Sequence, residues 1–458
     1  MLRKVPLIVI LGSTGTGKTK LSIELARRFN AEIISADSMQ VYKGLSIATA
    51  KATSHERSQA IHHMLDVVTT NEPFTVTHFR DMVLPIIDNL IQSSKMPIIV
   101  GGTNYYIESI LWHNLVSPGV GKRKNLLSDE KLHGLEEEVQ NFLQNSSLDD
   151  LMANMESIKL YEYLKLIDPP MANRLHPNNK RKIMRALEVF KDHGERLSDI
   201  LKDQRRLPGA SILGGPQRFQ NVIIFWLQCE QETLNQRLDA RIDSMVKDGL
   251  LKEIRTFYDE HVSDRNDIDY EKGVLQTIGF KEFIPYLEAY DKTNDDLIDH
   301  FVNASESCEK PQGWKMLEEC LEELKLVTKR YSKKQLKWIR NRFLGRDVGA
   351  VPLVYPLDTS DVKLWNDNVM NPAFEAVEDY LNERSIKIHP VEKIQRLVEG
   401  SNEETSFFCD VCKRVFIGDY QWKLHMNSNK HKRAIAGMKK REKLLQQEAN
   451  VAKETTDN

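Results

Sequence analysis

The sequence lacks the features of a membrane protein, a polycation or a disulfide-rich protein. No apolar run approaches the roughly 20 residues that a membrane-spanning helix needs, so we expect no membrane association. The formal net charge is only −2, so any nucleic-acid surface must be local. Of five cysteines, Cys229, Cys308 and Cys320 are scattered, which indicates a reducing compartment and no disulfide framework.

A targeting presequence of ordinary length is also missing, because a strand-like apolar run already begins at Leu7. We therefore expect a cytoplasmic protein, with a nuclear share, or a mitochondrial share from another start site, left open. Its 458 residues are 41% hydrophobic and 28% charged, which is typical of a globular chain with about two to four domains. We expect a monomer.

The run at 7–11 leads into a glycine-rich loop and then into a helical apolar pattern. The loop reads Gly-x-x-x-x-Gly-Lys-Thr, and a strand, this loop and a helix in succession predict a P-loop. Its glycines let backbone N–H groups point at phosphate oxygens, and the helix N-terminus adds its dipole. The predicted diphosphate-binding residues are Gly12, Ser13, Thr14, Gly15, Thr16, Gly17, Lys18 and Thr19. The motif alone does not identify the ligand or its fate.

A strand is predicted at 222–227, and two further motifs follow predicted strands at 32–35 and 97–100. The first begins with Asp37, and the second contains the glycines at 101 and 102. Ligands of a doubly wound sheet lie at the carboxyl ends of its strands, so both motifs should face the P-loop crevice. An aspartate there can hold Mg²⁺, cap a loop or act as a general base, and Gly-Gly-Thr alone fits a tight turn as well as a site.

The C-terminal region has the ligand spacing of a small zinc module. Two cysteines two residues apart are followed, after twelve residues, by two histidines five residues apart, which predicts a structural Zn²⁺ held by Cys409, Cys412, His425 and His431. Phe416 and Trp422 occupy core positions of a ββα finger. Residues 409–443 contain ten Lys and Arg against three Asp and Glu, which favours contact with nucleic acid.

Strands alternating with helices, and strands that are almost continuously apolar, predict an α/β fold with a P-loop NTPase-like parallel sheet flanked by helices. A helical insertion domain and the Cys₂His₂ zinc finger complete the expected architecture. The expected parts are a first core segment, a helical insertion, a second core segment with basic helices, a linker, the finger and a disordered tail, at 1–112, 113–206, 207–345, 346–404, 405–445 and 446–458.

Together these segments resemble the tRNA dimethylallyltransferase (tRNA isopentenyltransferase) family in its eukaryotic form, which often carries such a finger. The resemblance covers about residues 5–345. It rests on the P-loop and on Asp37–Tyr42, Gly101–Thr103, His176–Lys182, Arg185–Val189, Gln236–Arg241, Ile278–Glu282 and Tyr331–Gln335. One departure is Asn179, where the family usually has aspartate; it bears on a local salt bridge and not on the chemistry.

The resemblance implies transfer of a dimethylallyl group from dimethylallyl diphosphate to N6 of adenosine 37 of tRNA, immediately 3′ of the anticodon. The products are N6-isopentenyladenosine and diphosphate. It implies Asp37 as the base, Thr19 and Arg237 as catalytic residues facing each other across the diphosphate, and catalytic Mg²⁺. The target base would flip out of its stack to reach Asp37. The resemblance also implies that the insertion at 113–206 contacts the tRNA anticodon arm. The implied tRNA- or adenine-binding residues are Ser38, Gln40, Gly101, Thr103, Arg181, Arg185, Gln276, Lys281 and Lys334.

Three alternatives stay open at this point. A small-molecule or nucleotide kinase shares the P-loop, the sheet and a helical lid, and would be stabilised by ATP rather than by dimethylallyl diphosphate. A non-enzymatic RNA-binding protein with a degenerate P-loop is disfavoured by intact Lys18, Thr19 and Asp37. An adenylate isopentenyltransferase, which uses free AMP or ATP, is disfavoured by the insertion, the basic helices and the finger.

Overall fold

The structure is a computed structural model. It describes residues 5–114, 136–144, 151–152, 154–211, 213–263, 265, 268–303, 309–346, 352–394 and 405–439. The chain divides into two compact units, the first comprising Met1–Leu115 with Leu207–Gln395 and the second Val116–Arg206 with Arg396–Asn458. Each unit has its own apolar core.

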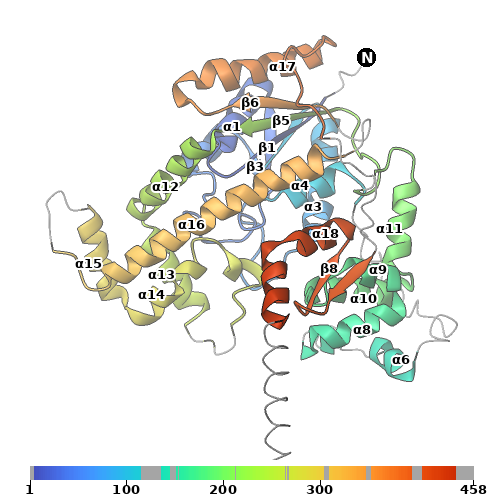
Figure 1. The fold of residues 1–458 in the computed structure, drawn as a ribbon. Helices are drawn as coiled ribbons and strands as arrows, with labels where there is room; N and C mark the ends of the chain where they lie inside the picture. The colour runs from blue at the N-terminus through green and yellow to red at the C-terminus, as the bar shows by residue number, and fades with distance from the viewer. Residues whose placement is uncertain are drawn as a thin grey trace, which may run out of the picture. The chain divides into compact units, whose positions relative to one another are not determined.

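The first unit is built on a parallel sheet (Figure 1). Among the described residues its strands are β1 (Leu7–Gly12), β2 (Ala31–Ser35), β3 (His62–His63), β4 (Met96–Val100), β5 (Val222–Gln228) and β6 (Val354–Asp358). Their order is β3-β2-β4-β1-β5-β6, and all neighbours are parallel. The strands expected from the apolar runs are confirmed as β1, β2, β4 and β5, and the predicted parallel α/β sheet is confirmed.

Helices cover both faces of this sheet. Those on the faces are α1 (Lys18–Phe29) and α17 (Asn371–Leu381) on one side and α3 (Val76–Gln92) and α4 (Asn104–Leu111) on the other. The other helices of this unit are α2 (Ser54–Gln59), α12 (Gln231–Lys247), α13 (Leu250–His261), α14 (Ile284–Ala289), α15 (Lys292–Asn303) and α16 (Trp314–Trp338). Short 3₁₀ or π turns lie at Gly273–Gln276, Lys281–Phe283, Ile339–Phe343, Val362–Leu364 and Asn366–Met370. Side chains of a strand alternate between faces. Leu7 and Val9 of β1 therefore join the core beneath α3 and α4, while Ile8 joins the core beneath α1 and α17.

The prediction of a linker at 346–404 is wrong for the middle of that segment. Strand β6 pairs in parallel with β5 and extends the sheet, and α17 packs against α1 on one face of the sheet. The physical reason is burial: Leu357, Val369 and Val377 belong to the same core cluster as β1 and α1. This segment is therefore part of the first unit.

The second unit contains helices with a separate core, as expected for an insertion. These are α6 (Glu137–Gln144), α8 (Ser157–Ile167), α9 (Pro169–Arg174), α10 (Lys180–His193) and α11 (Leu197–Arg206). The C-terminal module consists of the antiparallel strands β7 (Ser406–Cys409) and β8 (Arg414–Ile417) and the helix α18 (Asp419–Asn427). The tail predicted at 446–458 lies outside the described residues. None of the described helices is both long and apolar enough to cross a membrane.

Candidate active site and metal centre

A cavity of about 810 Å³ lies in the first unit, where β1, β2 and β4 end. The P-loop, the loops after β2 and β4, and helices α12 and α16 contribute to its wall. The structure brings many of the predicted site residues together here, namely Thr14, Gly15, Gly17, Lys18, Thr19, Asp37, Ser38, Gln40, Gly101, Gln276, Lys281 and Lys334.

The P-loop connects β1 to α1 through two glycines in the left-handed region. Gly15 has φ +85° and Gly17 has φ +86°, a backbone conformation that residues with a side chain rarely adopt. Below them Ser13 is fully buried, and its carbonyl accepts hydrogen bonds from Thr16 Oγ1 at 2.8 Å and from Lys18 Nζ at 2.7 Å. Gly12, Ser13 and Thr16 are not among the described residues that line the cavity, so they shape the loop from beneath.

Lys18, Asp37 and Arg241 are charged groups that share the cavity. Burial and, to a smaller extent, the charge of Arg241 lower the pKa of Lys18 to about 7, while the carboxylate of Asp37 opposes both effects. Burial also lowers the pKa of Arg241, again opposed by Asp37. Two desolvated cations therefore lie near one carboxylate, and a bound polyanion would compensate them.

Asp37 lies in the turn after β2, packed against the loop that follows β4. Its Oδ1 accepts a hydrogen bond from the Met39 N–H at 3.0 Å. A Cβ placed on Gly102 would lie 3.0 Å from Asp37 Oδ2, so the backbone of Gly102 directly adjoins this carboxylate. Thr103 joins the two loops, because its hydroxyl accepts from the Ser38 N–H at 2.9 Å and donates to Ser38 Oγ at 3.1 Å.

Helix α16 supplies two residues that the sequence analysis did not assign to the site. Gln335 donates to the Gly102 carbonyl at 2.9 Å and accepts from the Thr14 N–H at 2.8 Å, which ties the P-loop to the loop after β4. Burial and the Asp37 charge raise the pKa of Tyr331, whose hydroxyl remains protonated and donates to the same carbonyl at 3.4 Å. Both residues lie in the Tyr331–Gln335 motif, one helical turn apart.

Gln40 is occupied within the protein, although the sequence suggested that it reads the adenine edge. Its Oε1 accepts from Ser35 Oγ at 2.8 Å, and its Nε2 donates to the carbonyls of Thr49 and Ala50 at 3.0 and 3.2 Å. The amide therefore fixes the chain at 49–50 beside the cavity. Contact with a base would use the remaining lone pair of Oε1 or require these bonds to rearrange.

The structure places a different arginine in the cavity from the one that was expected. Arg237 donates to Cys229 Sγ at 3.4 Å and to the Ser360 carbonyl at 2.9 Å, and it is not among the described residues that line the cavity. Arg241, one turn further along α12, lines the cavity and donates to Thr14 Oγ1 at 3.1 Å. The structure therefore does not place Arg237 at the cavity beside Thr19, and Arg241 lines the cavity instead.

The remaining predicted RNA contacts lie on the surface of different elements. Lys281 pairs with Glu271 at 3.9 Å at the cavity. Arg181 and Arg185 belong to α10 in the second unit, where Arg181 is exposed and Arg185 pairs with Glu188 at 3.2 Å. The described residues thus divide the predicted RNA-binding set between the two units.

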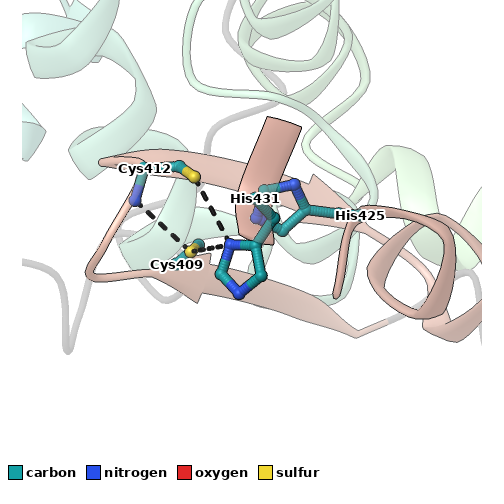
Figure 2. Close-up of side chains that lie close together, drawn as sticks. All are labelled: Cys409, Cys412, His425 and His431. Atoms are coloured by element: carbon teal, nitrogen blue, oxygen red, sulfur yellow. Dashed lines mark hydrogen bonds between the residues drawn. The ribbon is translucent and has the colours of Figure 1, made fainter. Parts of the chain in front are cut away.

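The four predicted zinc ligands lie together in the C-terminal module (Figure 2). One ligand atom from each of Cys409, Cys412, His425 and His431 lies within 4.8 Å of the others. His431 Nδ1 is 3.6 Å from the sulfur of Cys409 and 3.4 Å from that of Cys412. The Nε2 atoms of both histidines are buried and, among the described residues, have no hydrogen-bond partner.

This donor set fits a tetrahedral Zn²⁺, which takes thiolates at about 2.3 Å and imidazoles at about 2.0–2.1 Å. The rings expected to form the core meet beside it, with centroids 6.0 Å apart for Phe416 and Trp422 and 3.9 Å apart for Phe416 and His425. All four coordination positions are supplied by protein, which is typical of a structural site.

Comparisons with known proteins agree over most of the chain. The family model described as IPP transferase matches residues 40–342, and one described as zinc-finger double-stranded RNA-binding matches residues 406–432. The tRNA dimethylallyltransferase of Homo sapiens is 38% identical, with 96% of this chain and 88% of that protein covered. The Saccharomyces cerevisiae protein of the same name is 32% identical, with 94% and 92% covered.

A solved structure gives the same result in three dimensions. It is described as a eukaryotic dimethylallyltransferase acting on tRNA. The TM-score is 0.74 at 28% sequence identity, and the match covers 97% of this chain and 100% of that one.

Proposed function

The chain belongs to the IPP transferase family, and we propose that it is a tRNA dimethylallyltransferase. It transfers a dimethylallyl group from dimethylallyl diphosphate to N6 of the adenosine immediately 3′ of the tRNA anticodon. The observation that carries this proposal is one cavity in which the carboxylate of Asp37 faces the cations Lys18 and Arg241. A carboxylate beside a diphosphate cradle suits the removal of a proton from a nucleophile as diphosphate leaves.

Asp37 acts on the acceptor. The lone pair of adenine N6 is delocalised into the ring, so the amine attacks poorly unless a base accepts its proton. In the balanced step the allylic C–O bond breaks, the N6–C bond forms and the N6 proton passes to Asp37. The hydrogen bond from the Met39 N–H orients one carboxylate oxygen and leaves the other beside Gly102 for the acceptor.

The P-loop and α12 act on the leaving group. Negative charge builds on the bridging oxygen as the C–O bond breaks, and preorganised donors stabilise it most when they are desolvated. Lys18, Arg241 and the N–H groups of the glycine-rich loop are placed for this role. The hydroxyl of Thr19, which lines the same cavity, is the protein group that would hold Mg²⁺ together with diphosphate oxygens. Mg²⁺ bound there would supply further charge compensation.

The anticodon stem-loop would contact both units. Lys334 and Lys281 at the cavity, and Arg181 and Arg185 on α10, offer cations for RNA phosphates. The zinc finger, with its local excess of basic residues, adds affinity for the RNA backbone and takes no part in the chemistry. The protein acts as a monomer on cytoplasmic tRNA, which light scattering and localisation of the tagged protein would test.

The decisive experiment mixes the full-length protein with Mg²⁺, dimethylallyl diphosphate and an anticodon stem-loop carrying adenosines after the anticodon. Mass spectrometry should find one added C₅H₈ unit on the adenosine immediately 3′ of the anticodon, and Asp37→Ala should abolish it. Free AMP serves as the alternative acceptor and ATP as the alternative phosphate ligand. Transfer to AMP alone, or stabilisation by ATP without transfer to any RNA, would refute the proposal.

A further inference from the structure

Trp365 lies behind the P-loop, in a part of the chain that the IPP transferase match at 40–342 does not include. It follows β6 and the short 3₁₀ turn Val362–Leu364, and it precedes the π turn that leads into α17. The indole is 6% exposed and belongs to the core cluster shared by α1 and the sheet. The cavity itself does not need this residue as a wall, since Trp365 is not among the described lining residues.

The indole touches the P-loop at its most constrained point. A Cβ built on Gly17 would lie 2.8 Å from both Cη2 and Cζ3 of Trp365, so the far edge of the ring packs directly against the glycine backbone. Gly17 is also the N-cap of α1 and lines the cavity. The backbone of this one residue therefore separates the diphosphate site from the indole.

Two side chains of α1 hold the indole in this position. Its Nε1–H donates to the carboxylate of Glu24, at 2.9 Å to Oε2 and 3.2 Å to Oε1. The Lys20 ammonium lies 4.5 Å from the centre of the ring, within cation–π distance. Residues 17, 20 and 24 lie on one face of the first turns of α1. The planar, rigid indole ring of Trp365 thus contacts all three residues of that face.

A rigid ring in this position is important because a phosphate-binding loop binds its ligand well only when its N–H groups are already oriented. Gly17 has a left-handed φ of +86°, but glycine adopts many other conformations at little cost, so contacts from its surroundings restrict the loop to this one. Without the ring, the loop would gain a void on the side opposite the cavity and could relax into it. The indole closes that route.

We propose that Trp365 is a positioning residue for the diphosphate site, because its ring fixes the backbone of Gly17 from the side opposite the ligand. This inference rests on the proposed function for the identity of the ligand. It assigns the segment from β6 to α17, outside the family match, a part in substrate binding.

The test compares Trp365→Leu with Phe374→Leu in the full-length protein. Phe374 serves as the control because it is partly buried against the same core cluster and packs edge-on against Phe29, at the other end of α1, with ring centroids 5.9 Å apart. Each variant is measured for its melting temperature, its Kd for dimethylallyl diphosphate with Mg²⁺, and its KM for each substrate. Trp365→Leu should raise the Kd and KM for the diphosphate substrate by about tenfold or more, with the KM for RNA unchanged.

Phe374→Leu should lower the melting temperature without changing the Kd for dimethylallyl diphosphate. A Trp365→Leu protein that melts earlier but binds dimethylallyl diphosphate with wild-type affinity would overturn the proposal, as would equal Kd increases in the two variants. If the wild type binds dimethylallyl diphosphate but transfers nothing to RNA, the proposed function fails, while the ratio of affinities still decides the role of Trp365.

A second measurement covers the case in which Trp365→Leu does not fold. The wild type is labelled with 5-fluorotryptophan, and the milder Trp365→Phe variant identifies the ¹⁹F resonance of Trp365 among the six tryptophans. Addition of dimethylallyl diphosphate should shift this resonance, because the ring adjoins the backbone that binds the ligand. An unmoved resonance at saturating ligand would overturn the proposal.

Discussion

Replacing Arg241 by alanine tests which arginine of α12 serves the leaving group. Arg241 lines the cavity and contacts Thr14, whereas Arg237 is bonded to Cys229 and the Ser360 carbonyl. Removal of one preorganised donor for developing negative charge costs about 10²–10³ in kcat, or roughly 3–4 kcal/mol. We expect Arg241→Ala to lose turnover in this range. Arg237→Ala loses only structural hydrogen bonds, each contributing about 1 kcal/mol, and should keep kcat within about tenfold.

The effect of Arg241→Ala should fall more on kcat than on KM. In the wild type the charge of Arg241 lowers the pKa of Lys18, together with burial. Without Arg241 the pKa of Lys18 rises and this lysine is more fully charged near neutral pH. It then recovers part of the binding to the substrate diphosphate, but it cannot replace a donor aimed at the oxygen that becomes charged in the transition state.

The assay is steady-state transfer to the anticodon stem-loop, with dimethylallyl diphosphate and RNA varied separately. Arg241→Lys is a useful intermediate, because it keeps a charge but loses the planar fork of donors. Melting temperatures of all variants separate misfolding from lost chemistry. A kcat loss for Arg237→Ala equal to or larger than that for Arg241→Ala would refute the placement of Arg241 at the diphosphate.

Three further outcomes follow from the site. The pKa of Lys18 is about 7 before ligand binds, and a bound anion raises it. Affinity for dimethylallyl diphosphate, measured by calorimetry, should therefore weaken by up to about tenfold per pH unit above pH 7, and Lys18→Arg should flatten this pH profile. A flat wild-type profile would contradict the prediction. Asp37→Asn should abolish transfer yet leave the Kd for dimethylallyl diphosphate within a few-fold, and retained turnover would remove Asp37 from the mechanism. Cys412→Ser should release zinc and weaken RNA binding without changing single-turnover transfer at saturating RNA; unchanged zinc content by atomic absorption would refute the centre.

The parts of the fold that were predictable are those with a strong local signal. Strands β1, β2, β4 and β5 are short apolar runs buried on both faces, and the P-loop and the Cys₂His₂ spacing are continuous motifs. In these segments, neighbouring residues in the sequence are sufficient to specify the local structure. The insertion was recognisable for the same reason, because its amphipathic helices interrupt the α/β pattern.

Strand β6 carries no such signal. Its middle residue is Pro356, which argues against a central strand. Proline is acceptable here because, within the part of the chain that the structure describes, β5 is the only strand that pairs with β6, so β6 forms the edge of the sheet. Strand β3 covers just His62–His63, too few residues to show a period. Both segments become strands because they pair with a strand at the edge of the sheet. This is a tertiary interaction, and their own residues do not indicate it.

The active site shows a finer limit of the same kind. Arg237 and Arg241 are one helical turn apart on α12, so their spacing places both on one face and cannot say which turn reaches the P-loop. Which arginine points toward the P-loop depends on Ser360, more than 100 residues away, because its carbonyl accepts a hydrogen bond from Arg237 and holds that side chain outside the cavity. That serine follows β6, the strand that was not predicted from the sequence. Once β6 is placed, Arg237 has a hydrogen-bond partner outside the cavity, and Arg241 is the one of these two arginines that lines the cavity.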